Sequence, residues 1–341
     1  MSSDSKRSAP DEVLLIRGAP VDGICKIAVP DGFDPPRMVL NGTASFLPYV
    51  PELPSRAQQL WLGPGKWTKP LTMRRRPVIN YMADADLYET ALRKADEIVQ
   101  LIKLPAFNAP AAVLRTRRDQ VAASLAELPG VHMPRTIRTP APDRATLVEV
   151  IATEGLTFPL LIRAAGAHGG EGMIKVDHVG DLETAKIRFD DGQLYVTEFF
   201  DFADADGLYR KHRIVVVGQD IFLRHVIIGD TWLLHAERRA QNTEIEEQAA
   251  LAAFVERTAP AIRSAVMAVA DALHLDYFGI DCSLRPDGSM LVFEANACMN
   301  MLHNSAPSPS MWDAPIATIL AALRGLLADP ARWRAQPPLA A

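Results

Sequence analysis

The sequence predicts a mixed α/β (α+β) protein, in which alternating strands and helices are followed by a largely antiparallel sheet. Short apolar runs alternate with segments of helical periodicity over residues 76–200. After residue 207, several consecutive runs alternate apolar with polar residues, as antiparallel strands do. A four-residue turn, PDGS, then joins the last two predicted strands as a hairpin.

The composition is typical of a globular protein and argues against several other classes. Of the 341 residues, 48% are hydrophobic and 23% are charged, and the net charge of −5 provides no basic field for nucleic acid or an anionic membrane. The cysteines, Cys25, Cys282 and Cys298, have no CxxC spacing, so we expect neither a disulfide framework nor a zinc site. No apolar run is long enough for a signal peptide or a membrane span. A soluble cytoplasmic protein is therefore expected.

The first part of the chain predicts an irregular α/β region. Residues 1 to about 75 are rich in Pro and Gly and contain short apolar runs, which predict short strands. The first ten residues are expected to be disordered. The next predicted elements are a strand at 76–82, a helix at 84–104, a turn at 107–110 and a helix at 112–128.

The pattern changes after Pro129-Gly130 and continues to the C-terminus. The middle part predicts a strand at 131–139, a helix at 144–155, a strand at 158–163, a glycine-rich loop at 164–172, a strand at 173–176, a helix at 180–189 and a strand at 193–200. The last part predicts strands at 208–218, 220–229 and 231–236, a long helix at 244–275, strands at 276–285 and 290–297, and a terminal helix. Pro260 should kink or split the long helix.

The last two strands are predicted to place two acids opposite each other. If Arg285 pairs with Met290 across the turn, Asp281 faces Glu294 directly. The same face then carries Ser283 and Asn296, and the other face carries Ile280, Cys282, Leu284, Leu291, Phe293 and Ala295. Facing carboxylates repel each other, and a divalent cation such as Mg²⁺ bound between them would make the interaction favourable. A polar, solvated sheet face with a register slip of one residue explains the pattern equally well.

The glycine-rich loop AAGAHGGEG (164–172) matches neither a Walker A motif nor the GxGxxG dinucleotide pattern. Its amides could cradle phosphate, or its glycines serve only to turn the chain. Arg163, Arg213 and Arg224 each lie in an apolar strand, where a cation needs an anionic partner, either a ligand or an ordinary ion pair. The stretch YVTEFFD (195–201) is either a hinge that binds a flat base or a plain buried strand.

The order of these motifs resembles the ATP-grasp superfamily over roughly residues 77–325. The resemblance is greatest to the ATP-grasp modules attached to tetratricopeptide repeats in bacteria, although this chain shows no such repeats. It implies three domains, a pre-grasp α/β domain (1–110), a small central domain (111–198) and a C-terminal domain (199–341). ATP would be held between the last two domains, and a homodimer would be in keeping with the family.

The resemblance also implies roles for individual residues. Asp281, Glu294 and Asn296 match the Mg²⁺ ligands. The positions that match the ATP-binding residues are Arg118, Arg163, the phosphate loop 166–173 with Gly166, His168, Gly169 and Gly170, and the adenine hinge Glu198 and Phe199. Arg118 and Arg163 replace lysines of the family, which keeps the charge but changes the geometry. After Asn296 the chain reads ACMNML in place of the usual Pro-Gly turn, so the resemblance does not identify the acceptor.

The function implied by the resemblance is that of an ATP-dependent ligase that joins a carboxylate to an amine or a thiol through an acyl phosphate. Arg163, Arg213 and Arg224 would offset negative charge during phosphoryl transfer. The substrates would be small molecules or a peptide, with no nucleic acid or membrane involved. Two alternatives remain open, a kinase on the same scaffold and a non-catalytic nucleotide-binding protein.

Overall fold

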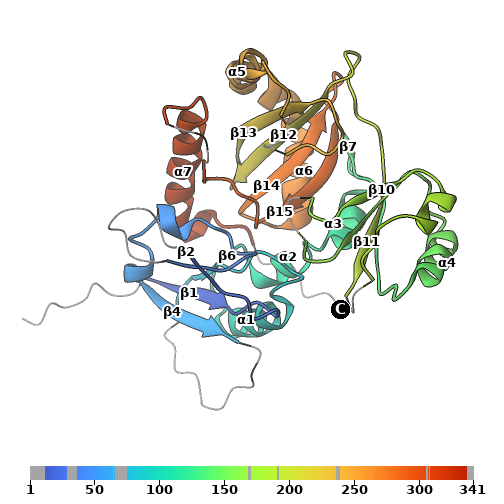
Figure 1. The fold of residues 1–341 in the computed structure, drawn as a ribbon. Helices are drawn as coiled ribbons and strands as arrows, with labels where there is room; N and C mark the ends of the chain where they lie inside the picture. The colour runs from blue at the N-terminus through green and yellow to red at the C-terminus, as the bar shows by residue number, and fades with distance from the viewer. Residues whose placement is uncertain are drawn as a thin grey trace, which may run out of the picture.

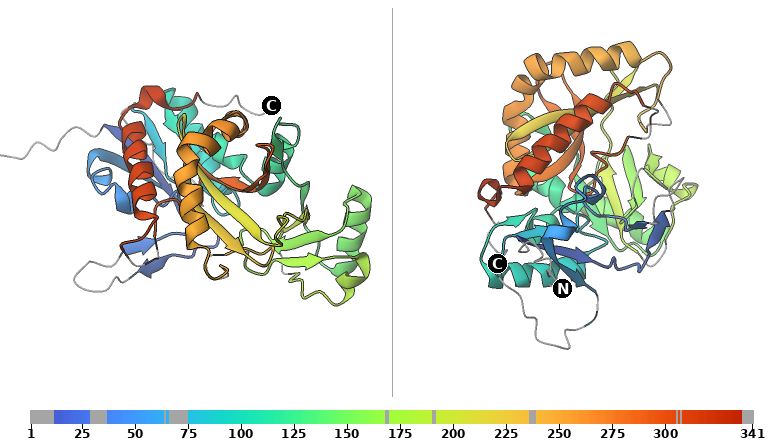
Figure 2. Two further views of the ribbon diagram at one scale, coloured as in Figure 1. Left: turned by 90° about the horizontal axis from the view of Figure 1, so that it is seen from above. Right: turned by 90° about the vertical axis from the view of Figure 1, so that its left-hand side faces the viewer.

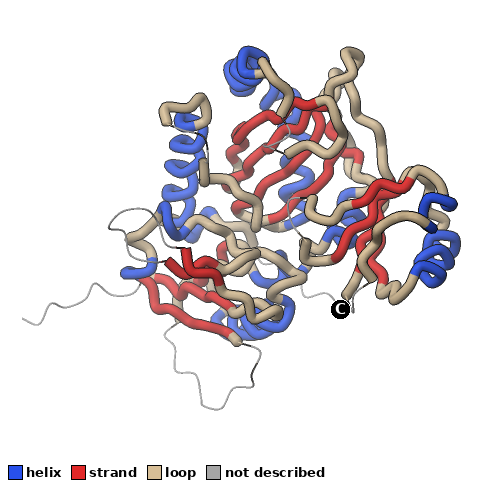
Figure 3. Tube along the Cα trace, viewed as in Figure 1, coloured by secondary structure: helices blue, strands red, loops and turns tan. Residues whose placement is uncertain are grey.

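The computed structural model describes residues 12–28, 37–63, 65, 75–167, 170–189, 192–235, 239–304, 306 and 308–335. Within these ranges the strands form one five-stranded sheet, two four-stranded sheets and one two-stranded sheet, with helices against them (Figures 1 and 3). The predicted mixed α/β fold is therefore confirmed. None of the helices that the structure describes combines the length and apolar character that a membrane span requires. The predicted disorder of the first ten residues lies outside the described part.

The N-terminal sheet is parallel and has the strand order β4-β1-β5-β6. Its strands are β1 (Val13–Gly18), β4 (Ala57–Leu62), β5 (Val78–Asn80) and β6 (Ala106–Phe107). Helix α1 (Glu89–Ile102) packs against this sheet through an apolar face that includes Leu92, Ala95 and Val99. The smaller elements are β2 (Lys26–Ala28) and β3 (Arg37–Val39), which pair with each other, and the 3₁₀ turns η1 (Leu47–Tyr49) and η2 (Pro54–Arg56).

The prediction of a single helix at 112–128 is wrong, because this segment forms two helices, α2 (Pro110–Leu114) and α3 (Arg118–Leu125). Thr116 donates its hydroxyl to the Val113 carbonyl at 2.7 Å, and Arg117 has the extended conformation of φ −60° and ψ 144°. A side chain that bonds to a nearby carbonyl offers the backbone an alternative to helix. The break turns the chain so that Arg118 begins a new helix.

The central sheet is antiparallel, with the order β10-β9-β11-β8. It contains β8 (Thr136–Thr139), β9 (Leu160–Ala164), β10 (Ile174–Val176) and β11 (Leu194–Glu198), and it packs on α4 (Arg144–Glu154). The strand predicted at 131–139 is in fact two, since β7 (Val131–His132) belongs to the five-stranded sheet and Pro134 separates it from β8. The helix predicted at 180–189 is only a 3₁₀ turn, η3 (Val179–Glu183). Helix α4 ends at Gly155 with φ 62°, as predicted.

The five-stranded sheet has the order β13-β12-β14-β15-β7 and is backed by helices (Figure 2). Its remaining strands are β12 (Tyr209–Val217), β13 (Asp220–Gly229), β14 (Tyr277–Leu284) and β15 (Met290–Asn296), and its helices are α5 (Glu244–Ala253), α6 (Ala259–Leu273) and α7 (Asp313–Leu327), with η6 (Pro330–Arg332) at the end. The long helix is interrupted as predicted, by the π-helical turn η5 (Phe254–Thr258), and Pro260 lies in the first turn of the helix that follows. Residues 231–235 form no strand, contrary to the prediction for 231–236.

The hairpin of β14 and β15 pairs Asp281 with Glu294, as predicted. The pairing predicted next to the turn is nevertheless wrong by one residue, because Leu284 and not Arg285 pairs with Met290. A bulge directly after Asp281 leaves Phe293 unmatched in the register and so restores the predicted pairing of the acids. Since a bulge shifts the alternation, two residues predicted for the core face line the cavity described below, Leu291 and Phe293.

A buried polar joint connects the N-terminal sheet to β14. The Asn108 amide nitrogen donates to the Tyr277 carbonyl at 2.8 Å, and its amide oxygen accepts the backbone N–H groups of Asp276 and Tyr277 at 2.8 and 3.0 Å. Asn80 donates to the Asn108 carbonyl at 2.9 Å. Asn108 is only 1% exposed, so protein groups rather than water satisfy these bonds. The joint fixes the start of the strand that carries Asp281.

Candidate functional site

A cavity of about 220 Å³ lies between the central sheet and the five-stranded sheet. The central sheet and its loops contribute Thr136, Leu161, Arg163, Gly170, Met173, Thr197, Glu198, Phe199, Phe200 and Phe202. The other side is formed by Arg118, Met133, Pro134, Lys211, Arg213, residues 232–235, Asp281, Leu291, Phe293 and Glu294. One part of this cavity is aromatic and the other is charged, which suits a ligand with a flat apolar end and a polyanionic end.

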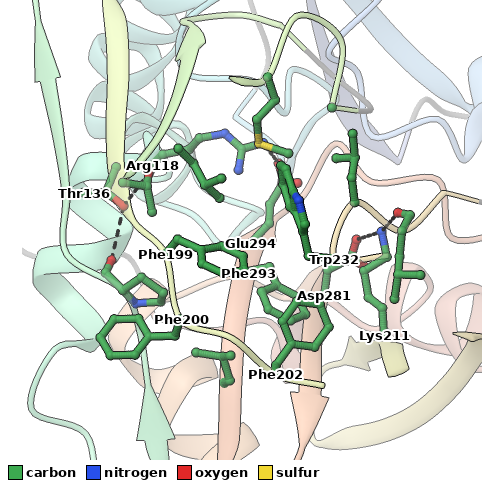
Figure 4. Close-up of a pocket in the computed structure, with 18 of the residues that line it drawn as sticks. Arg118, Thr136, Phe199, Phe200, Phe202, Lys211, Trp232, Asp281, Phe293 and Glu294 are labelled. Carbon is green, nitrogen blue, oxygen red and sulfur yellow. Dashed lines mark hydrogen bonds and ion pairs between the residues drawn. The ribbon is translucent and has the colours of Figure 1, made fainter. Parts of the chain in front are cut away.

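The aromatic part is built by the segment after β11 and by its neighbours. Phe199 meets Trp232 edge to face with ring centroids 5.6 Å apart, and Phe202 lies 4.6 Å from Phe293. In Figure 4, Phe199 and Phe200 lie on the opposite side of the cavity from Lys211, with Trp232 between them. Aromatic side chains provide stacking surfaces for a planar ring without requiring flexible groups to be ordered.

Asp281 lies at the charged end and is paired with two cations. Arg213 donates to both of its carboxylate oxygens, from Nε at 2.7 Å and from a terminal nitrogen at 2.8 Å. The Lys211 ammonium lies 3.6 Å from the same carboxylate. Burial alone would raise the pKa of Asp281, but the facing Arg213 and Lys211 hold it well below its ordinary value. The carboxylate is therefore ionised at neutral pH.

Glu294 is paired on the other side of the hairpin with Arg118, through an ion pair to Oε1. The same oxygen accepts the side-chain amide of Asn296 at 2.7 Å, and the Asn296 oxygen accepts the Cys298 backbone N–H at 3.0 Å. Among the described residues no partner is found for the second oxygen of Glu294. The two facing carboxylates thus avoid mutual repulsion because each has its own arginine.

Arg163 and Arg224 are both buried, at 8% and 5% exposed, but only Arg163 lines the cavity. Arg163 donates to the Ala167 carbonyl, and its buried Nε has no partner in the described part of the chain. Burial, and then the nearby Arg118, lower the pKa of Arg163 to about 10. Arg224 instead donates to the His303 carbonyl at 2.8 Å, which directs it away from the cavity. Burial, and then repulsion from Arg213, lower its pKa to about 10.

The predicted hinge lies at the rim of the cavity, although part of it is used structurally. Glu198 accepts the Thr157 backbone N–H through Oε1 at 2.8 Å, and the Phe199 N–H donates to the Pro159 carbonyl at 2.8 Å. One oxygen of Glu198 is therefore taken by the protein. The Phe199 ring lies under the Lys175 ammonium, 4.7 Å from the ring centre.

The structure brings most of the predicted site residues together. Eight of them line the cavity, namely Arg118, Arg163, Gly170, Glu198, Phe199, Arg213, Asp281 and Glu294. Asn296 and Gly166 line a smaller adjoining cavity that shares Arg118 and Glu294 with the first. His168 and Gly169 lie outside the described residues, and Arg224 does not reach the cavity.

Several lining residues were missed from the sequence. Lys211 could have been found, because it is two residues before Arg213 in the same strand and therefore points to the same face. Trp232 carries no such signal, since its segment alternates like a strand but is folded as a loop. Phe293 reaches the cavity only through the bulge in β15.

The donors around Glu294 fit a hard divalent cation by type. Asp281, Glu294 and Asn296 provide carboxylate and amide oxygens, the ligands that Mg²⁺ prefers, and one Glu294 oxygen has no partner among the residues that the structure describes. Within the described ranges, no group of three or more His, Cys, Asp or Glu side chains is arranged to hold a metal by itself. The set therefore suits Mg²⁺ that takes further ligands from a bound phosphate.

Comparison with known proteins supports the fold. No protein-family model matches the chain, and neither does any curated protein. Among solved structures, carboxyaminoimidazole ribonucleotide synthase from Aspergillus clavatus, complexed with ATP, is 15% identical with a TM-score of 0.50, and the match covers 91% of this chain and 77% of that one. The VanG D-Ala:D-Ser ligase from Enterococcus faecalis is 13% identical with a TM-score of 0.51, over 93% and 99% of the two chains. The fold of this chain is the ATP-grasp fold.

Proposed function

We propose that the protein is an ATP-dependent ligase that joins a carboxylate to an amine or a thiol through an acyl phosphate. The observation that carries the proposal is the pair of facing acids, Asp281 and Glu294, each bound to an arginine at the charged end of an aromatic cavity. A fold alone hosts many functions, so the proposal depends on this site. The ligases with the same fold support the reaction class.

ATP would bind with its base in the aromatic part and its phosphates toward the arginines. Phe199 and Trp232 would contact the base, and Glu198 at the rim would contribute its remaining oxygen. The guanidinium groups of Arg118, Arg163 and Arg213 would neutralise the phosphates, because a partly enclosed cavity has a lower dielectric than water and strengthens each charge contact. The Nε of Arg163, which has no partner within the described residues, could donate to such an anion.

Asp281, Glu294 and Asn296 would hold Mg²⁺ against the phosphates. A bound Mg²⁺ would offset negative charge on the phosphates and polarise them. The protein's own contribution is to hold the two acids at fixed positions on paired strands, where Asp281 is bonded to Arg213 and Glu294 to Arg118. Arg163 and Arg213, both nearly buried, would stabilise charge as the γ-phosphoryl group moves to the substrate carboxylate.

The acid and its acceptor would enter through the smaller adjoining cavity. This cavity is lined by Asp84, Asp86, Thr116, Arg117, Gly166, Asn296 and Cys298, and it meets the larger one at Arg118 and Glu294. A substrate carboxylate there would lie next to Arg118, where the phosphoryl group would also be held. The two cavities would thus deliver the reacting groups to one point from opposite sides.

Calorimetric titration with ATP, with and without Mg²⁺, tests the nucleotide site without knowledge of the substrate. We expect Mg²⁺-dependent binding in the wild type and at least tenfold weaker binding in Glu294→Ala, since tenfold corresponds to about 1.4 kcal/mol. Glu52→Ala is the matched control, because Glu52 is an exposed acid that lies outside the cavity and makes a long ion pair, of 3.9 Å, with Arg324. Absence of ATP binding by the folded wild type would refute the proposal.

Hydroxylamine trapping then distinguishes the reaction. Carboxylic acids, including amino acids and short peptides, are screened for ATP- and enzyme-dependent hydroxamate, because an acyl phosphate reacts with hydroxylamine. A ligase gives hydroxamate together with ADP. A phosphorylated hydroxyl without hydroxamate would indicate a kinase, and ATP binding without release of ADP across the screen would indicate a non-catalytic protein.

A further inference from the structure

We propose that Lys211 forms an ion pair with the Asp281 carboxylate while the nucleotide site is empty. The protein would then bind a divalent cation weakly until ATP is bound. This inference rests on the proposed function, because it concerns the order in which ATP and metal bind to the same site. It assigns to Lys211 the role of a positioning residue that couples the two ligands.

The strand geometry aims Lys211 at the metal acids. Lys211 and Arg213 are two residues apart on β12 and so share a face, and Arg213 pairs in register with Asp281 on β14. The Lys211 side chain is 15% exposed and the Asp281 side chain is 7% exposed, so little water screens the pair. The ammonium, 3.6 Å from the carboxylate, therefore competes with any cation that approaches Asp281.

The two acids are neutralised unequally. In the described part of the chain Glu294 forms an ion pair only with Arg118 and keeps an open oxygen, whereas both Asp281 oxygens accept hydrogen bonds from Arg213 and one also faces Lys211. Adding a divalent cation at Asp281 would place three positive groups around one carboxylate. One of the protein cations must then yield or be offset.

Lys211 is the cation that can leave. Arg213 is fixed by two bonds to Asp281 and by a third to the Asn300 carbonyl at 3.0 Å. Lys211 lies 3.6 Å from Asp281 and makes its 2.7 Å hydrogen bond to the Leu234 carbonyl instead, so its flexible side chain can move from the acid toward an anion without breaking a hydrogen bond to Asp281. The phosphates of ATP would provide that anion in the same cavity.

A movement of the Lys211 side chain would also change a contact with the wall of the cavity. The Lys211 ammonium donates to the Leu234 carbonyl at 2.7 Å, and Leu234 is two residues after Trp232 in a segment that lines the cavity. Trp232 in turn meets Phe199 at 5.6 Å, in the part of the cavity proposed for the base. Lys211 therefore connects the metal acid to the base-binding wall.

Titration of the full-length protein with Mn²⁺ in the absence of nucleotide, followed by the electron paramagnetic resonance of free Mn²⁺, tests the inference. Removing a cation this close to a buried acid is expected to tighten Mn²⁺ binding by about tenfold or more in Lys211→Gln and Lys211→Met. Lys211→Gln retains a donor for Leu234, so it removes the charge while keeping the loop contact. Lys211→Arg retains the charge and should bind Mn²⁺ as weakly as the wild type.

A matched control is Lys175→Met, since Lys175 lies over Phe199 and pairs with Asp177 rather than with Asp281. It makes the same change of net charge and should leave Mn²⁺ affinity unchanged. A non-hydrolysable ATP analogue should tighten Mn²⁺ binding by a larger factor in the wild type than in Lys211→Gln, because Lys211 contributes to the coupling between the two ligands.

Unchanged Mn²⁺ affinity in folded Lys211→Gln would overturn the inference, as would equal tightening in Lys211→Arg or Lys175→Met. If Lys211→Met fails to fold, Lys211→Gln decides the matter alone. These results are separate from the proposed function, since a wild type that binds Mg-ATP and traps hydroxamate could still show no effect of Lys211. Conversely, absence of ATP binding by the wild type would refute the ligase without involving Lys211.

Discussion

The joint at Asn108 gives a stability prediction that can be worked out from its contacts. The Asn108 side chain satisfies three backbone groups, the N–H of Asp276 and both the N–H and the carbonyl of Tyr277. In Asn108→Gly all three lose their partner inside the protein. Asn108 has φ 43°, a conformation that glycine adopts without strain, so the change removes the hydrogen bonds and little else.

The expected loss of unfolding free energy is about 3–6 kcal/mol, because each buried polar group left unpaired costs about 1–3 kcal/mol and water can enter part of the space left by the side chain. Urea unfolding followed by circular dichroism measures it. The matched control is Lys103→Gly, which has φ 54° but is exposed at the end of α1, and should change stability by less than about 1 kcal/mol. A loss below about 1 kcal/mol in Asn108→Gly would show that the joint does not hold the two sheets together.

Three further predictions concern buried charges and one buried hydroxyl. Arg213→Met leaves Asp281 with only Lys211 and should cost about 3 kcal/mol of unfolding free energy, and a double variant that adds Asp281→Leu should recover part of it. Tyr195→Phe removes the 2.8 Å bond from the tyrosine hydroxyl to Asp86 and should cost about 1–2 kcal/mol in thermal unfolding, whereas an unchanged melting temperature would contradict this. Burial lowers the pKa of His212 to about 4, so its neutral form stabilises the fold fully above about pH 6.5 and this contribution, up to about 3 kcal/mol, is lost as the pH falls from 6.5 to 4. His212→Gln should flatten that part of the stability–pH curve, and an identical curve in both proteins would refute the assignment.

Elements with a strong local signal could be predicted from the sequence. Helix α1 has a continuous apolar stripe, α4 ends at a glycine in the left-handed conformation, and the turn at Pro260 interrupts the long helix. The pairing of Asp281 with Glu294 was predicted from the alternation of the two strands, and Arg213 was expected to need an anionic partner because a cation in an apolar strand is costly without one. Asp281 with Arg213 and Glu294 with Arg118 are the partners that the structure provides.

What could not be predicted depends on contacts between distant segments. The break before Arg118 depends on one hydroxyl bond and on the turn that follows it, while the apolar periodicity of 112–128 continues across it. Residues 231–235 alternate like a strand, yet the five-stranded sheet ends at β13 and they close the cavity instead. Their conformation follows from contacts such as that of Leu234 with Lys211, which no local pattern reveals.

The two bulges of the five-stranded sheet lie at the same position along the strands, next to the charged end of the site. One bulge follows Arg213 on β12 and leaves Arg224 of β13 unmatched, and the other follows Asp281 on β14 and leaves Phe293 of β15 unmatched. Arg213 and Asp281 are themselves paired across the two inner strands. The extra residues in β13 and β15 increase the local twist and let successive side chains turn to one face. Phe293 and Glu294 both reach the cavity for this reason, so the bulge that made the turn register unpredictable also joins the aromatic wall to the acid pair.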